Sequence, residues 1–548
     1  MPDPLASIPP GTQSATDVVT CKVFINGTPL SNEVLLQQLS ITKTFNKIAA
    51  AKIVFLDGSV AERNFSLSND DRFKPGNTIK VQLGYLGDAD TVFEGVIIKH
   101  GIRIRQQGAS VLVIEAKDKA VKLTMARKSA YHLNKTDTDI IRDLLTDYDN
   151  DVDTTTVQYD QLVQFDATDW DFILTRAEAN GMFAFTDNGK VLVKQPANMR
   201  APVLKATYGD NIRDFEAEMD VRRQLQQVTS QSWDFAKQQV VISDPGNAAF
   251  SENGNISSDD LGMVLGAEVQ LSHTGNLAAD ELQAWSNAYA LRNHLLKIAG
   301  RVSIQGQALV KPGDLITLDG VGDRFNGNVF VTGVLQQYEG AWQTDIQFGW
   351  REDWFYKKED VMDKPASGLL PGINGLQIGV VKDIEDPQSN EYQYRIRVQV
   401  PVINSDDDGI WARVATLDAG AGRGVYFRPQ VGDEVVVGFL NDDPREAIIL
   451  GCLHSNDQKK SPLPETTGKE QYGIVTNEKM KLIFDDSDKK IMIVATTGSG
   501  EKSIVMNDNG AFELKDEYEN HIKMDTTGIT IQSNGKVVIK GVQVLINS

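Results

Sequence analysis

The chain has 548 residues, enough for three or four domains, because a single hydrophobic core rarely grows beyond about 250–300 residues. Its net charge of −20 argues against nucleic-acid binding, which needs a basic surface, and against docking on anionic lipid. Cys21 and Cys452 are the two cysteines; they are too few for a disulfide framework and fit a reducing compartment.

Residues 1–20 are predicted to be a flexible N-terminal tail. They contain prolines and serines but neither a basic start nor an apolar core, so we expect no signal peptide. No later segment is apolar enough to be expected to span a bilayer. We therefore expect a protein that is made in the bacterial cytoplasm and that leaves the cell, if it does so, by a route other than general secretion.

Residues 21–130 are predicted to form a first β-barrel. Runs of β-branched and aromatic residues follow one another here, with turn signals such as Asn26-Gly27 and Asp57-Gly58 between them. The expected strands are 21–25, 40–45, 52–56, 78–83, 92–99 and 110–117.

One hairpin pattern of this barrel recurs twice later in the chain. A turn glycine is followed 19 or 20 residues later by a glycine inside the return strand. The second glycine permits a bulge or a close approach of two backbones in a strongly bent sheet. We interpret the copies as three related barrels, and three hairpins that share only turn chemistry are the alternative. The pairs are Gly76 and Gly95, Gly313 and Gly333, and Gly432 and Gly451.

Residues 131–205 are predicted to be an α/β insert. Thr136 to Asp139 precede an apolar helical pattern, and the sequence Thr168-Asp169-Trp170-Asp171 resembles a capping box that opens a second helix. That helix is expected to end at Asn180-Gly181, a usual left-handed cap. A hairpin with strands 182–186 and 190–194 should follow.

Residues 206–350 are predicted to form a second β-barrel. Strands are expected near Phe215 and over 231–234, a loop over the Gly-, Ser- and Asn-rich stretch 244–262, and the longest helix over 279–299. His294 on that helix is expected to be a packed or surface residue rather than a ligand. Strands 315–318 and 328–336 should close the barrel.

The remaining chain is predicted to hold a linker, a small barrel and a repetitive end. Residues 351–375 are rich in Pro, Gly and charge and indicate a linker. Residues 376–455 contain about five strands, the size of an oligonucleotide/oligosaccharide-binding (OB) fold, and a connector over 456–470 follows.

Residues 471–548 show short apolar runs about eight to ten residues apart, which suggests a β-solenoid. Each run offers only two or three inward side chains, too few for one chain to fill a core. The simplest solution is that three chains wind into one prism, which would also protect the strand edges. The runs are 482–484, 491–494, 504–506, 512–514, 522–524, 529–531, 537–539 and 542–546.

Four motifs resemble those of the valine–glycine-repeat (VgrG) spike proteins of type VI secretion and related phage tails. Their order matches from about residue 20 to the end of the chain. The motifs are 169–172 with Arg176, Ala177, Glu178 and Gly181, then 394–401, 411–414 and 427–439. The resemblance implies a mainly β protein with two hub β-barrels, an α/β insert, an OB-fold barrel and a C-terminal intertwined trimeric β-helix needle.

The resemblance also implies a function. We expect a non-enzymatic homotrimeric spike that adapts a sixfold tube to a threefold needle, and this needle punctures the target envelope. The expected partners are a hexameric inner tube and baseplate proteins at the hub, effector cargo, and a PAAR-type protein at the tip. Tip docking is assigned to Leu545, Ile546, Asn547 and Ser548. The particle would act outside the cell or in a target cell; a secretion system, a phage tail and a free extracellular particle all remain open.

We expect no cofactor, no metal and no catalytic residue. The chain has no Gly-rich phosphate loop, Cys-x-x-Cys or His-Glu-x-x-His motif, and its six histidines lack metal-ligand spacing. The sequence Asp406-Asp407-Asp408-Gly409 is interpreted as a solvated turn because it lacks the spacing of a calcium loop. Two alternative functions are a spike with a cell-wall hydrolase in the insert and an OB-type carbohydrate- or oligonucleotide-binding protein that uses Tyr392, Tyr394 and Arg397.

Overall fold

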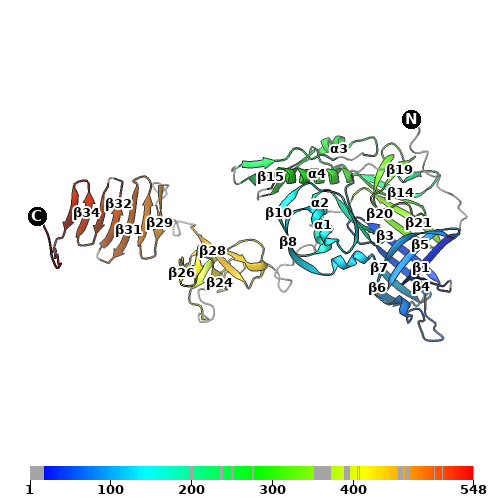
Figure 1. The fold of residues 1–548 in the computed structure, drawn as a ribbon, viewed down its shortest axis with the longest axis horizontal. Helices are drawn as coiled ribbons and strands as arrows, with labels where there is room; N and C mark the ends of the chain where they lie inside the picture. The colour runs from blue at the N-terminus through cyan, green and yellow to red at the C-terminus, as the bar shows by residue number, and fades with distance from the viewer. Residues whose placement is uncertain are drawn as a thin grey trace. The chain divides into compact units, whose positions relative to one another are not determined.

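The computed structural model describes most of the chain, and the chain divides into two compact units, Met1–Asp363 and Lys364–Ser548 (Figure 1). Both units are mainly β. Among the described residues, no helix is both long and apolar enough to cross a membrane. The described residues are 18–31, 33–196, 201–234, 239–248, 252–273, 277–350, 372–387, 395–403, 405–406, 408–454, 461–463, 470–498, 500–508 and 510–546.

One 13-stranded sheet contains most strands of the first unit. Its main path runs β14-β18-β21-β20-β3-β4-β7-β6-β5-β1-β2, and β13 and β19 join through β20. The strands are β1 Val19–Ile25, β2 Thr28–Pro29, β3 Leu36–Thr44, β4 Ala50–Leu56, β5 Thr78–Tyr85, β6 Asp88–Arg103, β7 Val111–Lys117, β13 Leu204–Thr207, β14 Ile212–Met219, β18 Ile298–Gln305, β19 Leu315–Asp319, β20 Gly327–Glu339 and β21 Ala341–Phe348.

The sheet encloses two separate hydrophobic cores, and we call β1–β7 the first module and β13, β14 and β18–β21 the second module. The two modules are joined because β20 pairs with β3 from Gly333–Thr44 to Tyr338–Leu39. Trp342 of β21 lies in the first core and packs against Tyr85. The expectation of two separate barrels is therefore modified: there are two cores, but their strands belong to one continuous sheet.

The repeated hairpin pattern is confirmed in its backbone geometry. Gly76, Gly313 and Gly432 have φ values of 100°, 91° and 87°, which only glycine adopts easily. The return glycines behave as expected of a bent sheet. A Cβ on Gly95 would lie 2.3 Å from a backbone oxygen of β7, whereas the register shifts beside Gly333 and Gly451. The three hairpins thus share more than generic turn residues.

The insert contains helices α1 Asp137–Leu144 and α2 Asp169–Ala179, with strands β8 Arg127–Thr136, β9 Asp149–Val152, β10 Gln158–Thr168, β11 Phe183–Asp187 and β12 Lys190–Lys194. Thr136 and Asp139 form a capping box, and the side chain of Thr168 caps α2. Gly181 follows α2 with a φ of 66°. The two predicted helices and the hairpin are confirmed.

Two predictions for the segment between β14 and β18 are wrong. Helix α4 spans Ala279–Leu295 and stops before 299, because Ile298 and Ala299 begin β18 and pair with β14. The predicted loop 244–262 contains the start of helix α3, Ser258–Leu265, which Ser257 and Asp260 cap. Strands β15 Gln227–Asp234, β16 Gln239–Ile242 and β17 Glu268–His273 form a small sheet in the order β16-β15-β17.

In the second unit, five strands form a closed barrel in the order β22-β23-β24-β28-β27. Strands β24 and β28 are parallel and the other pairs are antiparallel. The core includes Val381, Val398, Val435 and Ile449. The strands are β22 Gln377–Asp383, β23 Ile396–Gln399, β24 Ile410–Val414, β27 Glu434–Phe439 and β28 Ala447–Leu453, and the ribbon β25 Ala419–Gly420 and β26 Arg423–Gly424 lies between β24 and β27.

The chain end forms a seven-stranded antiparallel sheet in sequence order. The apolar runs from 482 to 531 thus lie in consecutive antiparallel strands of one chain, and the runs 537–539 and 542–546 lie outside these strands. The winding of three such chains into one prism stays a prediction. The strands are β29 Gln471–Val475, β30 Lys481–Asp485, β31 Lys490–Thr497, β32 Gly500–Met506, β33 Phe512–Lys515, β34 His521–Asp525 and β35 Gly528–Gln532.

Several predictions fall outside the described residues. They concern most of the N-terminal tail, most of the linker and of the connector, and the side chains of Tyr392, Tyr394, Asp407, Asn547 and Ser548.

Candidate functional site

One face of the C-terminal sheet is lined by apolar side chains, and we call it the apolar face. In an antiparallel sheet, directly paired residues lie on the same face. The register therefore aligns two apolar residues from every strand in two rows across the sheet. The residues are Tyr472, Ile474, Leu482, Phe484, Ile491, Ile493, Ile504, Met506, Phe512, Leu514, Ile522, Met524, Ile529 and Ile531.

Much of the apolar face is accessible to solvent in the single chain. Ile529 is 68% exposed, and Tyr472 and Ile531 are each 58% exposed. Part of the face borders a hollow of about 630 Å³, which Ile504, Leu514 and residues after β35 also line. Burying a large apolar side chain stabilises a protein by about 1.5–3 kcal/mol. If a partner buried seven of the fourteen side chains on the apolar face, the gain in free energy would be on the order of 10 kcal/mol.

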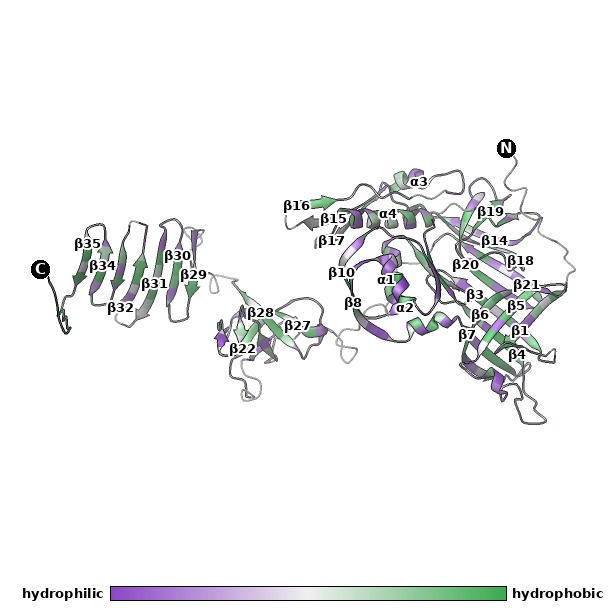
Figure 2. Cartoon of the chain, in the orientation of Figure 1, coloured by the Kyte–Doolittle hydropathy of each residue, from purple (hydrophilic) through white to green (hydrophobic). Residues whose placement is uncertain are grey.

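The polarity of the opposite face of the sheet changes from β30 to β34. Near β30 and β31 it is apolar, with Ile483 and Val494 buried. On β33 and β34 it is charged, with Glu513 paired with Lys523 and Lys515 paired with His521. Figure 2 shows apolar and polar residues side by side on these strands. The later strands are therefore amphipathic and need a partner on one face only.

Two of the four residues assigned to tip docking are described, and both Leu545 and Ile546 are 77% exposed. They belong to the segment after β35, which contains no helix or strand in its described residues.

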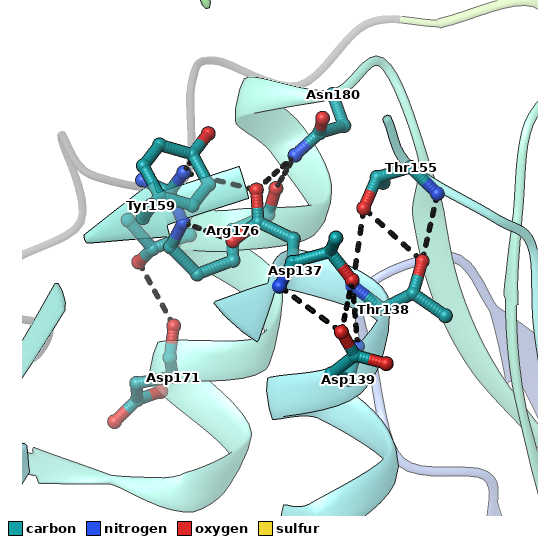
Figure 3. A network of polar contacts seen from close by, with 10 residues as sticks. Asp137, Thr138, Asp139, Thr155, Tyr159, Asp171, Arg176 and Asn180 are labelled. Atoms are coloured by element: carbon teal, nitrogen blue, oxygen red, sulfur yellow. Dashed lines mark hydrogen bonds and ion pairs between the residues drawn. The ribbon is translucent and has the colours of Figure 1, made fainter. Parts of the chain in front are cut away.

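The insert holds a dense polar network around Asp137 at the start of α1 (Figure 3). Arg176 donates to both carboxylate oxygens of Asp137 at 2.6 and 3.0 Å, and Asn180 donates at 2.7 Å. The Tyr159 hydroxyl accepts from Arg176 at 2.7 Å, and burial raises the pKa of Tyr159 above its usual range. A carboxylate with three donors is a poor base, so this network is better suited to holding α1, α2 and β10 together.

Of the three binding candidates in the OB barrel, Arg397 is the one that the structure describes. Arg397 donates a hydrogen bond to Asp408 at 3.0 Å, and its guanidinium lies 5.0 Å from the centre of the Trp411 ring. Its charge is therefore paired with groups of the barrel itself. Among the described residues of this barrel, the aromatic side chains that are largely exposed are Tyr426 and Phe427, which sequence reasoning did not select as binding residues. Their position in a Gly-rich segment between two strands was the signal that could have identified them.

Comparison with known proteins assigns the family. Residues 15–339, more than half of the chain, match the Alg8 N-terminal domain, and residues 377–454 match the type VI secretion system/phage-baseplate injector OB domain. The spike protein VgrG5 of Pseudomonas aeruginosa is 36% identical over 107 residues, and VgrG2a of the same organism is 30% identical over 179 residues. The chain belongs to the VgrG-type spike family and contains an Alg8 N-terminal domain.

The VgrG alignments are local. They cover 18% and 30% of this chain, and the chain spans only 14% of VgrG5 and 19% of VgrG2a. Among solved structures, a tail protein from Neisseria meningitidis is 14% identical with a TM-score of 0.46, and the match covers 62% of this chain and 98% of that protein.

Proposed function

We propose that three copies of this VgrG-type chain form the spike and hub of a contractile injection machine. Family membership supports the class of protein, and the apolar face supports the assembly. An isolated amphipathic sheet of this length leaves too much apolar surface in water, whereas three sheets arranged as a prism would bury all three apolar faces together. Two sister copies are therefore the proposed occupants of the apolar face.

The first unit supplies the proposed hub. Its two modules have separate cores and equivalent hairpins around Gly76 and Gly313, so three chains would present six similar units. Six such units in a ring would match a hexameric inner tube, whereas the C-terminal sheets would keep threefold symmetry. The hub is thus proposed to adapt sixfold to threefold symmetry and to contact tube and baseplate proteins.

The end of the chain is the proposed tip. The exposed Leu545 and Ile546 would give the prism an apolar end that a PAAR-type protein, with or without effector cargo, could cap. Penetration would be mechanical, since a net charge of −20 per chain is repelled by anionic lipid. The donors around Asp137 occupy its carboxylate, so this network gives no support to a hydrolase in the insert.

The deciding measurement is the mass of the full-length protein in solution. We expect about 181 kDa, three times the 60.3 kDa of one chain, and protection of residues 471–546 from protease. A stable 60.3 kDa monomer with a protected C-terminal sheet would overturn the proposal. A zymogram on peptidoglycan, expected to be blank, separates the spike from the hydrolase alternative.

A further inference from the structure

The OB barrel has two ends of opposite character. Because β24 and β28 are parallel, the segment 440–446 and the described residues of the segment 400–409, which lead into them, lie at the same end. The loop 415–433, which connects β24 to β27, lies at the other end. The intervening strand β27 has six residues, so the two ends are separated by roughly 20 Å.

The first end, which we call the acidic end, combines apolar and acidic residues. Val402 is 82% exposed, Ile403 is 63% exposed and Leu440 is 50% exposed. Asp442 and Glu446 lie beside Leu440, and Asp408 lies in the neighbouring segment, where its side chain remains largely exposed although it also binds Arg397. This end therefore has apolar contact area and negative charge.

The second end, which we call the basic end, combines apolar and basic residues. The exposed Tyr426 and Phe427 line a hollow of about 750 Å³ together with Arg413 and Arg428, and Leu417 is exposed in the same loop. The buried Nε of Arg428 finds no hydrogen-bond acceptor in the described part of the chain. The Arg428 side chain is only partly buried, so its guanidinium charge is accessible to an acceptor from outside the chain.

We propose that the acidic end of one OB barrel docks into the basic end of the barrel in the next copy. The inference rests on the proposed trimer and names the surfaces that join its OB barrels. Contacts between two different patches, repeated around a threefold axis, close into a ring. Leu440 and Val402 then fill the hollow beside Phe427, and Asp442 supplies negative charge near Arg428. Complementary charge also fixes the direction of the ring.

The direct test is cross-linking of the full-length protein with a short bis-maleimide. We use the double variant Phe427→Cys/Leu440→Cys with the exposed Cys452 changed to Ser. Cys21 is only partly buried, so it is changed to Ala in every variant. We expect covalent dimers and trimers from the double variant and only monomers from each single-cysteine variant. The separation across β27 prevents a link within one copy.

Charge reversal provides the second test in the same double-cysteine chain. Arg428→Glu and Asp442→Lys are each expected to lower the cross-linked fraction at least fivefold, and the two together should restore it to within about twofold. Arg105→Glu reverses the charge of an exposed residue in the first unit and is the control; it should leave the cross-linked fraction unchanged.

The outcomes separate this inference from the proposed function. A 181 kDa assembly that gives no cross-link, or whose single-cysteine variants link to themselves, overturns the head-to-tail ring but leaves the trimeric spike standing. A monomeric chain overturns both.

Discussion

Asp187 of β11 is bound by lysines from both modules of the first unit. Lys43 of β3 and Lys311, which precedes β19, both pair with its carboxylate, the latter at 2.7 Å. Lys43 also donates to Asn188 at 3.1 Å. Burial lowers the pKa of Lys43, and Asp187 offsets part of that effect. One carboxylate thus joins the insert to both modules.

Replacing Asp187 with Asn should destabilise the first unit by about 3 kcal/mol, because a buried lysine loses its counter-charge. Urea unfolding followed by tryptophan fluorescence measures the change. Asp143→Asn is the matched control: its partner Lys135 is exposed, so less than about 1 kcal/mol is expected. Equal effects of the two changes would contradict the structural role of Asp187.

Glu252 provides a pH prediction. Burial raises the pKa of Glu252, but hydrogen bonds from His294 and Lys297 outweigh it and hold the value at about 2. A carboxylate with a depressed pKa stabilises the fold above its ordinary pKa of about 4.5, and this contribution is lost as pH falls toward 2. Between pH 5 and pH 2, the free energy of unfolding of the wild type should therefore fall by on the order of 2 kcal/mol more than that of Glu252→Gln. Denaturant titrations at the two pH values measure this difference.

At the scale of elements, capping and turn residues in the sequence correctly predicted the helix ends that depend on local contacts. Thr136 and Thr168 marked the starts of α1 and α2, and Asn180-Gly181 marked the end of the latter. The end of α4 was mispredicted because pairing of Ile298 with β14 outweighs helical periodicity. The junction of β20 with β3 depends on strands almost 300 residues apart, and no local pattern reports it.

The same distinction applies to the candidate site. Apolar runs in the sequence located the strands from β30 to β35, but the pairing register was needed to place their side chains on one face. The two ends of the OB barrel were missed because loops with little sequence pattern form them.

For Gly262 in helix α3, the packing and the helix propensity predict opposite effects of a change to alanine. Gly262 lies inside α3, where alanine is favoured by about 1 kcal/mol. A Cβ at this position would lie 2.5 Å from the Leu225 carbonyl oxygen. We therefore expect Gly262→Ala to destabilise the protein by about 1–3 kcal/mol in thermal unfolding. Gly101→Ala, which meets no atom within 4 Å, is the control, and a stabilised Gly262→Ala would refute the contact.

At the scale of the whole molecule, neighbouring residues of β34 test the assembly. Ile522 lies on the apolar face and Lys523 on the opposite face. Ile522→Asp would bring three carboxylates into the proposed prism, so we expect the dissociation constant of the trimer to rise at least about a hundredfold. Lys523→Asp should leave it within about threefold. Sedimentation equilibrium measures both, and equal effects would contradict the prism.

The continuous sheet through β20 and β3 has a consequence for recombination of this protein with its relatives. Trp342 of one module completes the core of the other, so neither half of the first unit is a transferable part. An exchange of one module with a relative would place a foreign strand against β3 and a foreign ring against Tyr85. We therefore expect chimaeras cut between the two modules to misfold, whereas chimaeras cut between the two compact units should still fold.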